Sequence, residues 1–86
     1  MSAAVADAIG LHAQGEFAAC AQLLERVEPD WPRLGGSRAQ LEVVEDTLID
    51  ALSRSGDRPT DAIARLDARL ARRDVARDRA WRDRLR

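Results

Sequence analysis

Apolar residues recur at spacings of three and four along the first third of the chain, which is the pattern of amphipathic helices. Residues 3–14 carry two neighbouring apolar stripes, formed by Val5, Ile9, Ala8 and Leu11, with His12 next to the first stripe. Gly15 follows at a position where a helix would stop. A second helix is predicted over residues 16–27, and its apolar face consists of Phe17, Cys20, Leu23, Leu24 and Val27. These two segments therefore predict a helical hairpin that turns at Gly15.

A loop and a third helix are predicted next. Residues 29–36 contain Pro29 and Pro32, which end helices, and Trp31 is expected to pack against the helices from this loop. The third helix is predicted to begin after Ser37. Its apolar stripe consists of Leu41, Val44, Leu48, Ala51 and Leu52, and it is widened by Val43 and Ile49. The width of this stripe indicates that the helix packs on two sides.

The remaining chain predicts a fourth helix and a short fifth one. The third helix is expected to stop at Gly56, and the fourth to begin near Thr60 with the apolar residues Ile63, Leu66 and Leu70. The next positions in phase are polar, so a break is predicted near Arg73. The last helix is expected over residues 75–85, where the apolar residues are Val75, Trp81 and Leu85. Trp81 and Leu85 are predicted to dock this helix over the second hairpin as a cap.

The predicted fold class is all-α, with four or five helices arranged as antiparallel hairpins of the tetratricopeptide-repeat type. Few residues are aromatic or β-branched, and Ala, Leu, Arg and Glu are abundant. Short connections favour antiparallel neighbours. Residues 1–86 are predicted to form one domain, made of a hairpin over 3–28, a loop over 29–36, a hairpin over 37–73 and a C-terminal helix over 75–85.

Residues 1–34 resemble one tetratricopeptide repeat, a helix-turn-helix unit of about 34 residues. The positions that carry the resemblance are Ala8, Leu11, Gly15, Phe17, Cys20, Leu24, Val27 and Pro32. The chain departs from the repeat at Ala4 and Asp7, where the repeat has a tryptophan and a leucine. The first turn of the first helix is therefore expected to be weakly anchored. The second hairpin fits the repeat more loosely, with Gly56 as its turn glycine.

A narrower resemblance runs over residues 9–85. The stretches LGGSRAQ, EDTLIDALSRSGD and AIARLDARLARR are similar to the C-terminal end of the tetratricopeptide repeat protein 38-like family, whose members are several times longer. The chain has Leu41-Glu42 where the family continues Arg-Asp, and Arg73-Asp74 where the family has Arg-Pro. The resemblance implies helical-repeat structure and protein binding, in either a freestanding descendant of that module or a piece of it.

The glycine pair in LGGSRAQ raises the possibility of a phosphate site, because glycines before a helix let an anion approach the backbone N–H groups. No lysine follows in the pattern of a P-loop, and no strand precedes. A capping box is the stronger interpretation: Ser37 accepts from the N–H of Gln40, and Gln40 reaches back to the N–H of Ser37. Gly35 and Gly36 then serve to turn the chain out of the loop.

The charge of the chain is unevenly distributed. The net charge is −1, but residues 1–56 carry −5 and residues 57–86 carry +4, and every basic residue other than the single histidine is an arginine. Such asymmetry favours head-to-tail association or a partner of matching polarity. The N-terminus lacks the basic start and long apolar run of a signal peptide, and no stretch approaches the length of a membrane span. A cytoplasmic location is expected, without contact with a membrane.

Single residues with chemical potential are few. His12 has no second histidine, cysteine or acid at ligand spacing, so a half-exposed packing role is favoured over a binding role. Cys20 lies among apolar residues and is expected to be a small core residue. The acidic residues of the third helix, which are Glu42, Glu45, Asp46 and Asp50, are interpreted as a solvated face or as a patch for an arginine-rich partner. No metal, cofactor or catalytic group is predicted.

The C-terminal third of the chain holds nine arginines between Arg65 and Arg86, which suggests a nucleic-acid binder as one hypothesis. Acidic residues interleave with these arginines, at Asp67, Asp74, Asp78 and Asp83. Spacings of three and four, as from Asp74 to Arg77 and from Asp78 to Arg82, instead favour an exposed helix with ion pairs along it.

The function expected from the sequence is a non-catalytic protein-interaction module that binds a protein partner or another copy of itself. The reason is that two hairpins and a spare helix fall short of the roughly three repeats needed for a stable stack. Two alternatives stay open, namely an accessory subunit that escorts a peptide or substrate to an enzyme, and a nucleic-acid binder. The expected contact residues are Val5, Ile9, His12, Ala13, Arg77, Trp81 and Arg82.

Overall fold

A computed structural model describes residues 3–32, 38–56 and 58–86 of the chain. Its helices are α1 (Ala3–Ala13), α2 (Phe17–Arg26), the short 3₁₀ helix η1 (Glu28–Asp30), α4 (Arg38–Arg54), α5 (Pro59–Arg72) and α6 (Ala76–Leu85). Within the described ranges no residue belongs to a β-strand. The predicted all-α class is confirmed.

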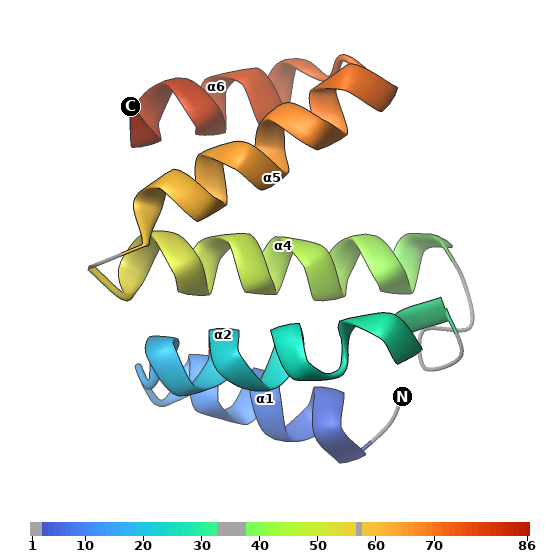
Figure 1. Ribbon diagram of the computed structural model, residues 1–86, viewed down its shortest axis with the longest axis vertical. Coiled ribbons are helices and arrows are strands. Elements are labelled where there is room, and N and C mark those ends of the chain that lie inside the picture. Colours follow the sequence, from blue (N-terminus) through green and yellow to red (C-terminus); the bar gives the residue numbers. More distant parts are fainter. Residues whose placement is uncertain (1–2, 33–37, 57) are drawn as a thin grey trace.

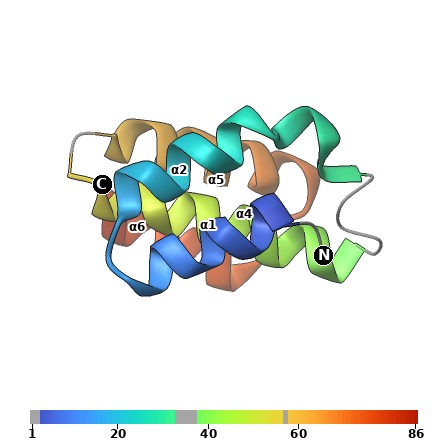
Figure 2. The same cartoon turned by 90° about the horizontal axis from the view of Figure 1, so that it is seen from below.

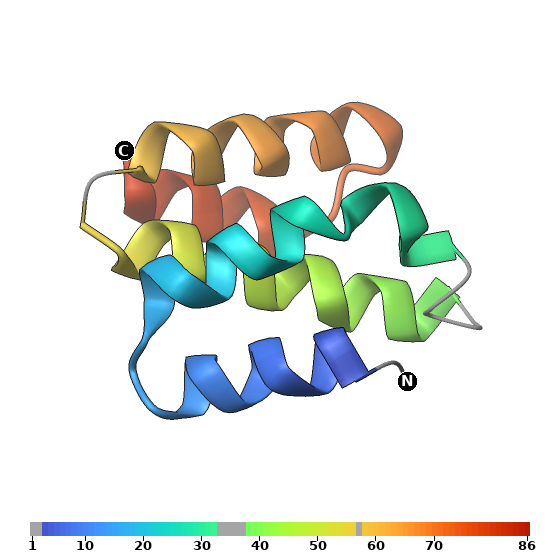
Figure 3. The same cartoon turned by 60° about the horizontal axis from the view of Figure 1, so that its bottom comes forward.

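The helices follow one another in antiparallel order and form two layers. Each helix packs on the next along the chain, from α1 through α2, α4 and α5 to α6 (Figure 1). Two further views show that α1, α4 and α6 lie in one layer while α2 and α5 lie in the other (Figures 2 and 3). Because α4 contacts both α2 and α5, it joins the two hairpins and is the central helix of the molecule.

The turns inside the two hairpins depend on glycine. Gly15 has a φ of 82° and Gly56 a φ of 91°, which is the left-handed region that side chains with a Cβ rarely adopt. At the first turn the N–H of Glu16 donates to the carbonyl oxygen of Leu11 over 2.9 Å, which closes the end of α1. The predicted helix stops at both glycines are confirmed.

The core is formed by the apolar faces of α2, α4 and α5. Its largest fully buried side chains are Leu24, Leu48, Ile49, Leu52 and Leu66, together with Val5 and Cys20. Full burial of each leucine or isoleucine stabilises the fold by about 1.5–3 kcal/mol. Phe17 packs on this core from the start of α2. The expectation that Val43 widens the buried stripe of α4 is wrong, because this side chain is 53% exposed on the opposite side.

The segment predicted as a loop over residues 29–36 is partly helical. η1 covers Glu28–Asp30, and residues 31–32 are helical as well. Trp31 is 8% exposed, so its predicted packing against the helices is confirmed. Gly35, Gly36 and Ser37 fall outside the described residues, and the capping box with Gln40 in the first turn of α4 stays a prediction.

The break predicted near Arg73 is confirmed. α5 ends at Arg72, Arg73 and Val75 have extended backbone angles, and α6 begins at Ala76. Trp81 and Leu85 are partly buried against the core, as expected for a cap. The fully buried residue of α6, however, is Asp78. Its carboxylate is bound by Arg69 of α5.

Candidate functional site

A shallow and widely open depression, named the groove here, lies over the layer of α1, α4 and α6. It has a volume of about 350 Å³. Its lining comes from three helices, with His12 from α1, Asp46, Thr47 and Asp50 from α4, and Arg77, Trp81 and Arg84 from α6. Three helices that are distant in sequence thus supply one continuous surface, and its middle is the polar side of α4.

One wall of the groove is a set of contacts around His12. Its Nε2 lies 2.6 Å from Oδ2 of Asp50, and the Nε of Arg54 donates to Oδ1 of the same carboxylate over 3.0 Å. The rings of His12 and Phe17 meet edge to face, with centroids 5.3 Å apart. The guanidinium of Arg54 lies 5.6 Å from the centroid of the Phe17 ring, within reach of a cation–π contact. His12 is therefore a half-buried packing residue with a polar edge on the groove.

The opposite wall belongs to α6. Nη2 of Arg77 lies 3.3 Å from Oδ2 of Asp46, which ties α6 to the polar side of α4. Trp81 lies one turn further along α6 and is half-buried, with part of its surface on the groove. The groove therefore offers an aromatic surface beside carboxylate, hydroxyl and guanidinium groups.

The structure brings together some of the contact residues expected from the sequence. His12, Arg77 and Trp81 meet at the groove, although 65 residues or more separate the first from the other two. Ala13 is exposed and Ile9 is partly buried against the core, and neither lines the groove.

One of those residues is not available for such a contact, and another lies outside the groove. Val5 is 2% exposed and belongs to the core, because its stripe of α1 faces the rest of the protein. Nη1 of Arg82 donates to Oδ1 of Asp67 over 3.1 Å, so Arg82 joins α6 to α5 away from the groove. Val5 is therefore corrected from a contact residue to a core residue, and a contact role for Arg82 stays a prediction.

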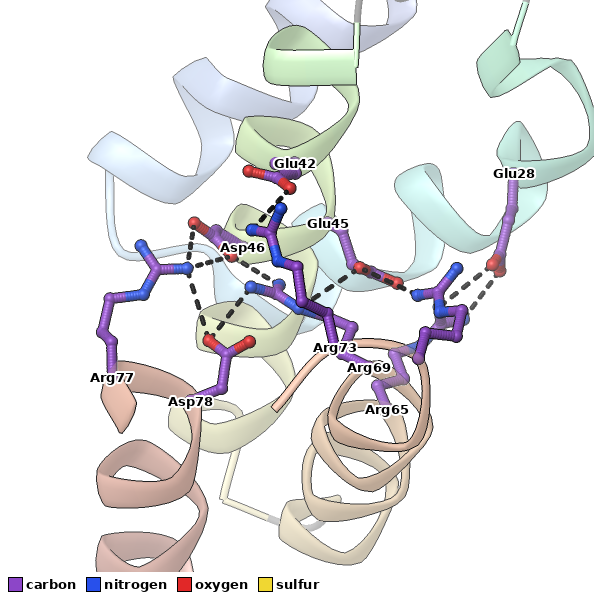
Figure 4. A network of polar contacts seen from close by, with 10 residues as sticks. Glu28, Glu42, Glu45, Asp46, Arg65, Arg69, Arg73, Arg77 and Asp78 are labelled. Atoms are coloured by element: carbon purple, nitrogen blue, oxygen red, sulfur yellow. Dashed lines mark hydrogen bonds and ion pairs between the residues drawn. The ribbon is translucent and has the colours of Figure 1, made fainter. Parts of the chain in front are cut away.

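A second feature is a network of ion pairs that joins acidic residues of η1, α4 and α6 to arginines between residues 65 and 77 (Figure 4). Nη2 of Arg73 donates to Oε1 of Glu42 over 3.3 Å. Arg65 donates two hydrogen bonds to the carboxylate of Glu28, of 2.6 and 3.0 Å, and these lower the pKa of Glu28. The acidic side of α4, interpreted above as a solvated face or a patch for an arginine-rich partner, thus pairs with arginines of its own chain.

Arg69 is the centre of this network. It is 9% exposed, and its guanidinium contacts Asp46, Asp78 and Glu45. Nη2 donates to Oδ1 of Asp78 over 3.1 Å, and Asp78 is itself only 3% exposed. The buried guanidinium and the buried carboxylate compensate each other's charge, because an unpaired charge away from water would strongly destabilise the folded state. The helices α4, α5 and α6 therefore meet at one guanidinium.

The ion pairs within α6 differ from those predicted by spacing. Asp74 pairs with Arg79 over 2.9 Å instead of with Arg77. Asp78 turns inward to Arg69 and Arg77 instead of pairing with Arg82. Spacing alone finds pairs along one helix, but it cannot find an inward-facing acid whose partner lies on the preceding helix. The one indication in the sequence was that polar residues interrupt the apolar stripe after Leu70, which is compatible with a polar contact between α5 and α6.

A larger opening of about 580 Å³ lies at the other end of α4. It is bordered by η1, the first half of α4 and the end of α5, with Trp31, Leu41, Glu45 and Arg72 among its lining. Burial raises the pKa of Glu45, against the opposing pull of Arg69 and Arg72. Its charged walls are mostly members of the same network, so this opening is part of the interface between helices.

Two further features concern the thiol of Cys20 and the clustering of possible metal ligands among the described residues. Cys20 is buried, and burial together with the nearby Asp50 raises the pKa of its thiol, which disfavours the reactive thiolate. Among residues 3–32, 38–56 and 58–86, no three His, Cys, Asp or Glu side chains are grouped so that they could hold a metal ion. None of the described helices combines the length and the apolar character that crossing a membrane requires.

No family model, curated protein or solved structure matches this chain.

Proposed function

We propose that the chain is a non-catalytic protein-interaction module of the tetratricopeptide type, and that it binds a segment of a partner protein across the groove of α1, α4 and α6. The observation that carries the proposal is the groove itself, where one layer of three helices supplies His12, Thr47 and Trp81 to a single open surface.

The mixture of side chains in the groove suits a protein segment. Trp81 offers a partly exposed aromatic surface, of the kind enriched at the centres of protein interfaces. Val43 lies four residues before Thr47 on α4 and adds an exposed apolar side chain to the same side of the helix. Asp50 and Arg77 are held in place by their ion pairs. Polar groups of a bound protein would therefore meet side chains whose orientation is already fixed.

The charge asymmetry along the sequence lends little support to a head-to-tail or nucleic-acid partner. Most arginines of α5 and α6, among them Arg65, Arg69, Arg77 and Arg82, have acidic neighbours from η1, α4 and α5, so much of their charge is balanced within the molecule. A surface that binds nucleic acid needs cations that are free to neutralise phosphates, which releases the counterions of the nucleic acid. The resemblance of the sequence to tetratricopeptide repeats also favours a protein as the partner.

The test is affinity capture from native cell extract with a tagged chain, followed by mass spectrometry. Thr47→Arg places a bulky cation in the middle of the groove, while Gln22→Arg places the same side chain on the exposed face of α2. A partner that depends on the groove is recovered with the unchanged chain and with Gln22→Arg, and is lost with Thr47→Arg. Circular dichroism of both variants confirms that they are folded. Equal recovery with Thr47→Arg would remove the groove as the binding surface.

A further inference from the structure

The joint between α5 and α6 is built differently from the turns within the two hairpins. Those turns use glycines with positive φ at residues 15 and 56, and Pro59 begins α5. The joint, residues 73–75, has the sequence Arg-Asp-Val, and no glycine or proline occurs from Thr60 to the end of the chain. The backbone at Arg73 and Val75 is extended. Asp74 and Val75 have low helix propensity, but neither they nor Arg73 exclude a helix as proline would, so contacts elsewhere contribute to holding this bend.

The contacts that hold α6 all lie on its boundary with α4 and α5. Asp78 is bound by Arg69 of α5, Arg77 lies against Asp46 of α4, and Arg82 donates to Asp67 of α5. The apolar part of the interface rests on partly buried side chains of α6, which are Trp81 and Leu85. Every one of these contacts would form equally well with the same helix from a second copy of the chain.

We propose that the protein forms a dimer by exchanging α6 between two copies. Residues 73–75 become helical, α5 and α6 join into one straight helix, and α6 docks on α4 and α5 of the other copy. α5 and α6 already run antiparallel to each other (Figures 1 and 3). Two straightened helices therefore lie side by side in opposite directions, with each α6 on the α5 of its partner. The exchange keeps the contacts of α6, which makes it a low-cost route to a dimer.

Like charges near the joint oppose the continuous helix that the exchange requires. In a continuous helix Arg73 and Arg77 would be four residues apart, as would Asp74 and Asp78, and like charges at this spacing oppose the helix modestly. The closed form avoids both pairs by its extended joint. The dimer should be the minor form at low protein concentration and should increase as the concentration rises, because its formation consumes two copies of the chain.

The exchange would also change the groove. Arg77, Trp81 and Arg84 line it from α6, so in the dimer each groove would take these three residues from the other copy. The inference does not rest on the proposed function of the groove, since it follows from the joint and the interface of α6 alone.

Ala76→Pro separates the two forms. Ala76 is the first residue of α6, where proline is well tolerated, and the extended Val75 before it is compatible with a following proline. In a continuous helix the same proline removes a hydrogen bond and clashes with the preceding turn. The variant therefore preserves the closed monomer and blocks the straight helix. Ala76→Ser is the matched control, because serine at this position permits both forms.

Sedimentation velocity from micromolar to millimolar protein measures the outcome. The unchanged chain and Ala76→Ser should form a dimer as concentration rises, and Ala76→Pro should weaken dimerisation at least tenfold. The double variant Asp74→Ala/Val75→Ala, which raises the helix propensity of the joint, should strengthen it. A straight helix over residues 59–85 would be about 40 Å long, which exceeds the longest extent of the monomer, 32 Å, so small-angle scattering should show that the dimer is elongated. A chain that is monomeric at all concentrations, or an Ala76→Pro variant that dimerises like its control, would overturn the inference.

Discussion

Arg69 is the buried cation at which α4, α5 and α6 meet, and replacing it by methionine measures how much its ion pairs stabilise the fold. Methionine keeps much of the length of the side chain but removes the guanidinium, which contacts Asp46, Asp78 and Glu45. Removing one partner of a buried ion pair costs about 3–5 kcal/mol. Arg77 still lies 3.3 Å from both Asp46 and Asp78, so we expect the lower end, about 3 kcal/mol.

Urea unfolding followed by circular dichroism measures this loss, with Arg72→Met as the matched control. Arg72 lies three residues further along α5, its side chain is 71% exposed, and its Nη2 is 3.9 Å from Glu45. An exposed ion pair of this kind contributes about 0–1 kcal/mol, so the control should lose little. In thermal unfolding, a loss of about 3 kcal/mol lowers the Tm of a domain this small by roughly 12–24 °C. The network would not be what joins the three helices if both variants lost the same free energy of unfolding. The same conclusion would follow if Arg69→Met lost less than about 1 kcal/mol of it.

Three further predictions concern a carboxylate, a glycine and the thiol. Because Arg65 lowers the pKa of Glu28 in the folded state, their pair stabilises the protein above the ordinary value of 4.5 and loses that contribution as the pH falls below it. Glu28→Gln should therefore cost at most about 1 kcal/mol at pH 7 and flatten the acid side of a stability–pH profile. Gly56→Ala should cost about 1 kcal/mol or more in urea unfolding, since its φ of 91° strains any residue with a Cβ; a neutral result would contradict the turn. Cys20 should react with a thiol reagent only as fast as the protein unfolds, and rapid labelling of the folded protein would refute its burial.

The helices were predictable because each is marked by apolar spacing and by residues that end helices. Gly15 and Gly56 marked the turns within the hairpins, and the loss of the apolar stripe after Leu70 marked the end of α5. Local sequence contains this information, since the period of a helix and the conformational freedom of glycine are local properties.

The polar contacts between helices were not predictable in the same way. The pairing of Arg65 with Glu28, or of Arg69 with Asp46, depends on which sides of two helices meet, and spacing along one helix does not determine this. Val43 shows the same limit for apolar residues. It continues the stripe of α4 in the sequence, yet it lies on the exposed side because the neighbouring helices cover only the other faces.

The residues of the groove were predictable in part for a related reason. His12, Arg77 and Trp81 were among the contact residues expected from the sequence, and all three line the groove. The groove itself needs α1, α4 and α6 in one layer, and Thr47 and Asp50 enter it only through that arrangement. No pattern in the sequence distinguishes these two residues from other polar positions of α4.

The two tryptophans provide the most direct measurement of the proposed function. Trp81 lines the groove, whereas Trp31 borders the larger opening at the other end of α4. Their indole N–H groups give two separate signals in a ¹⁵N–¹H correlation spectrum of the labelled protein. Titration with the partner recovered by the capture experiment should shift the Trp81 signal and leave that of Trp31 in place. A shift of Trp31 with Trp81 unchanged would contradict binding in the groove of α1, α4 and α6.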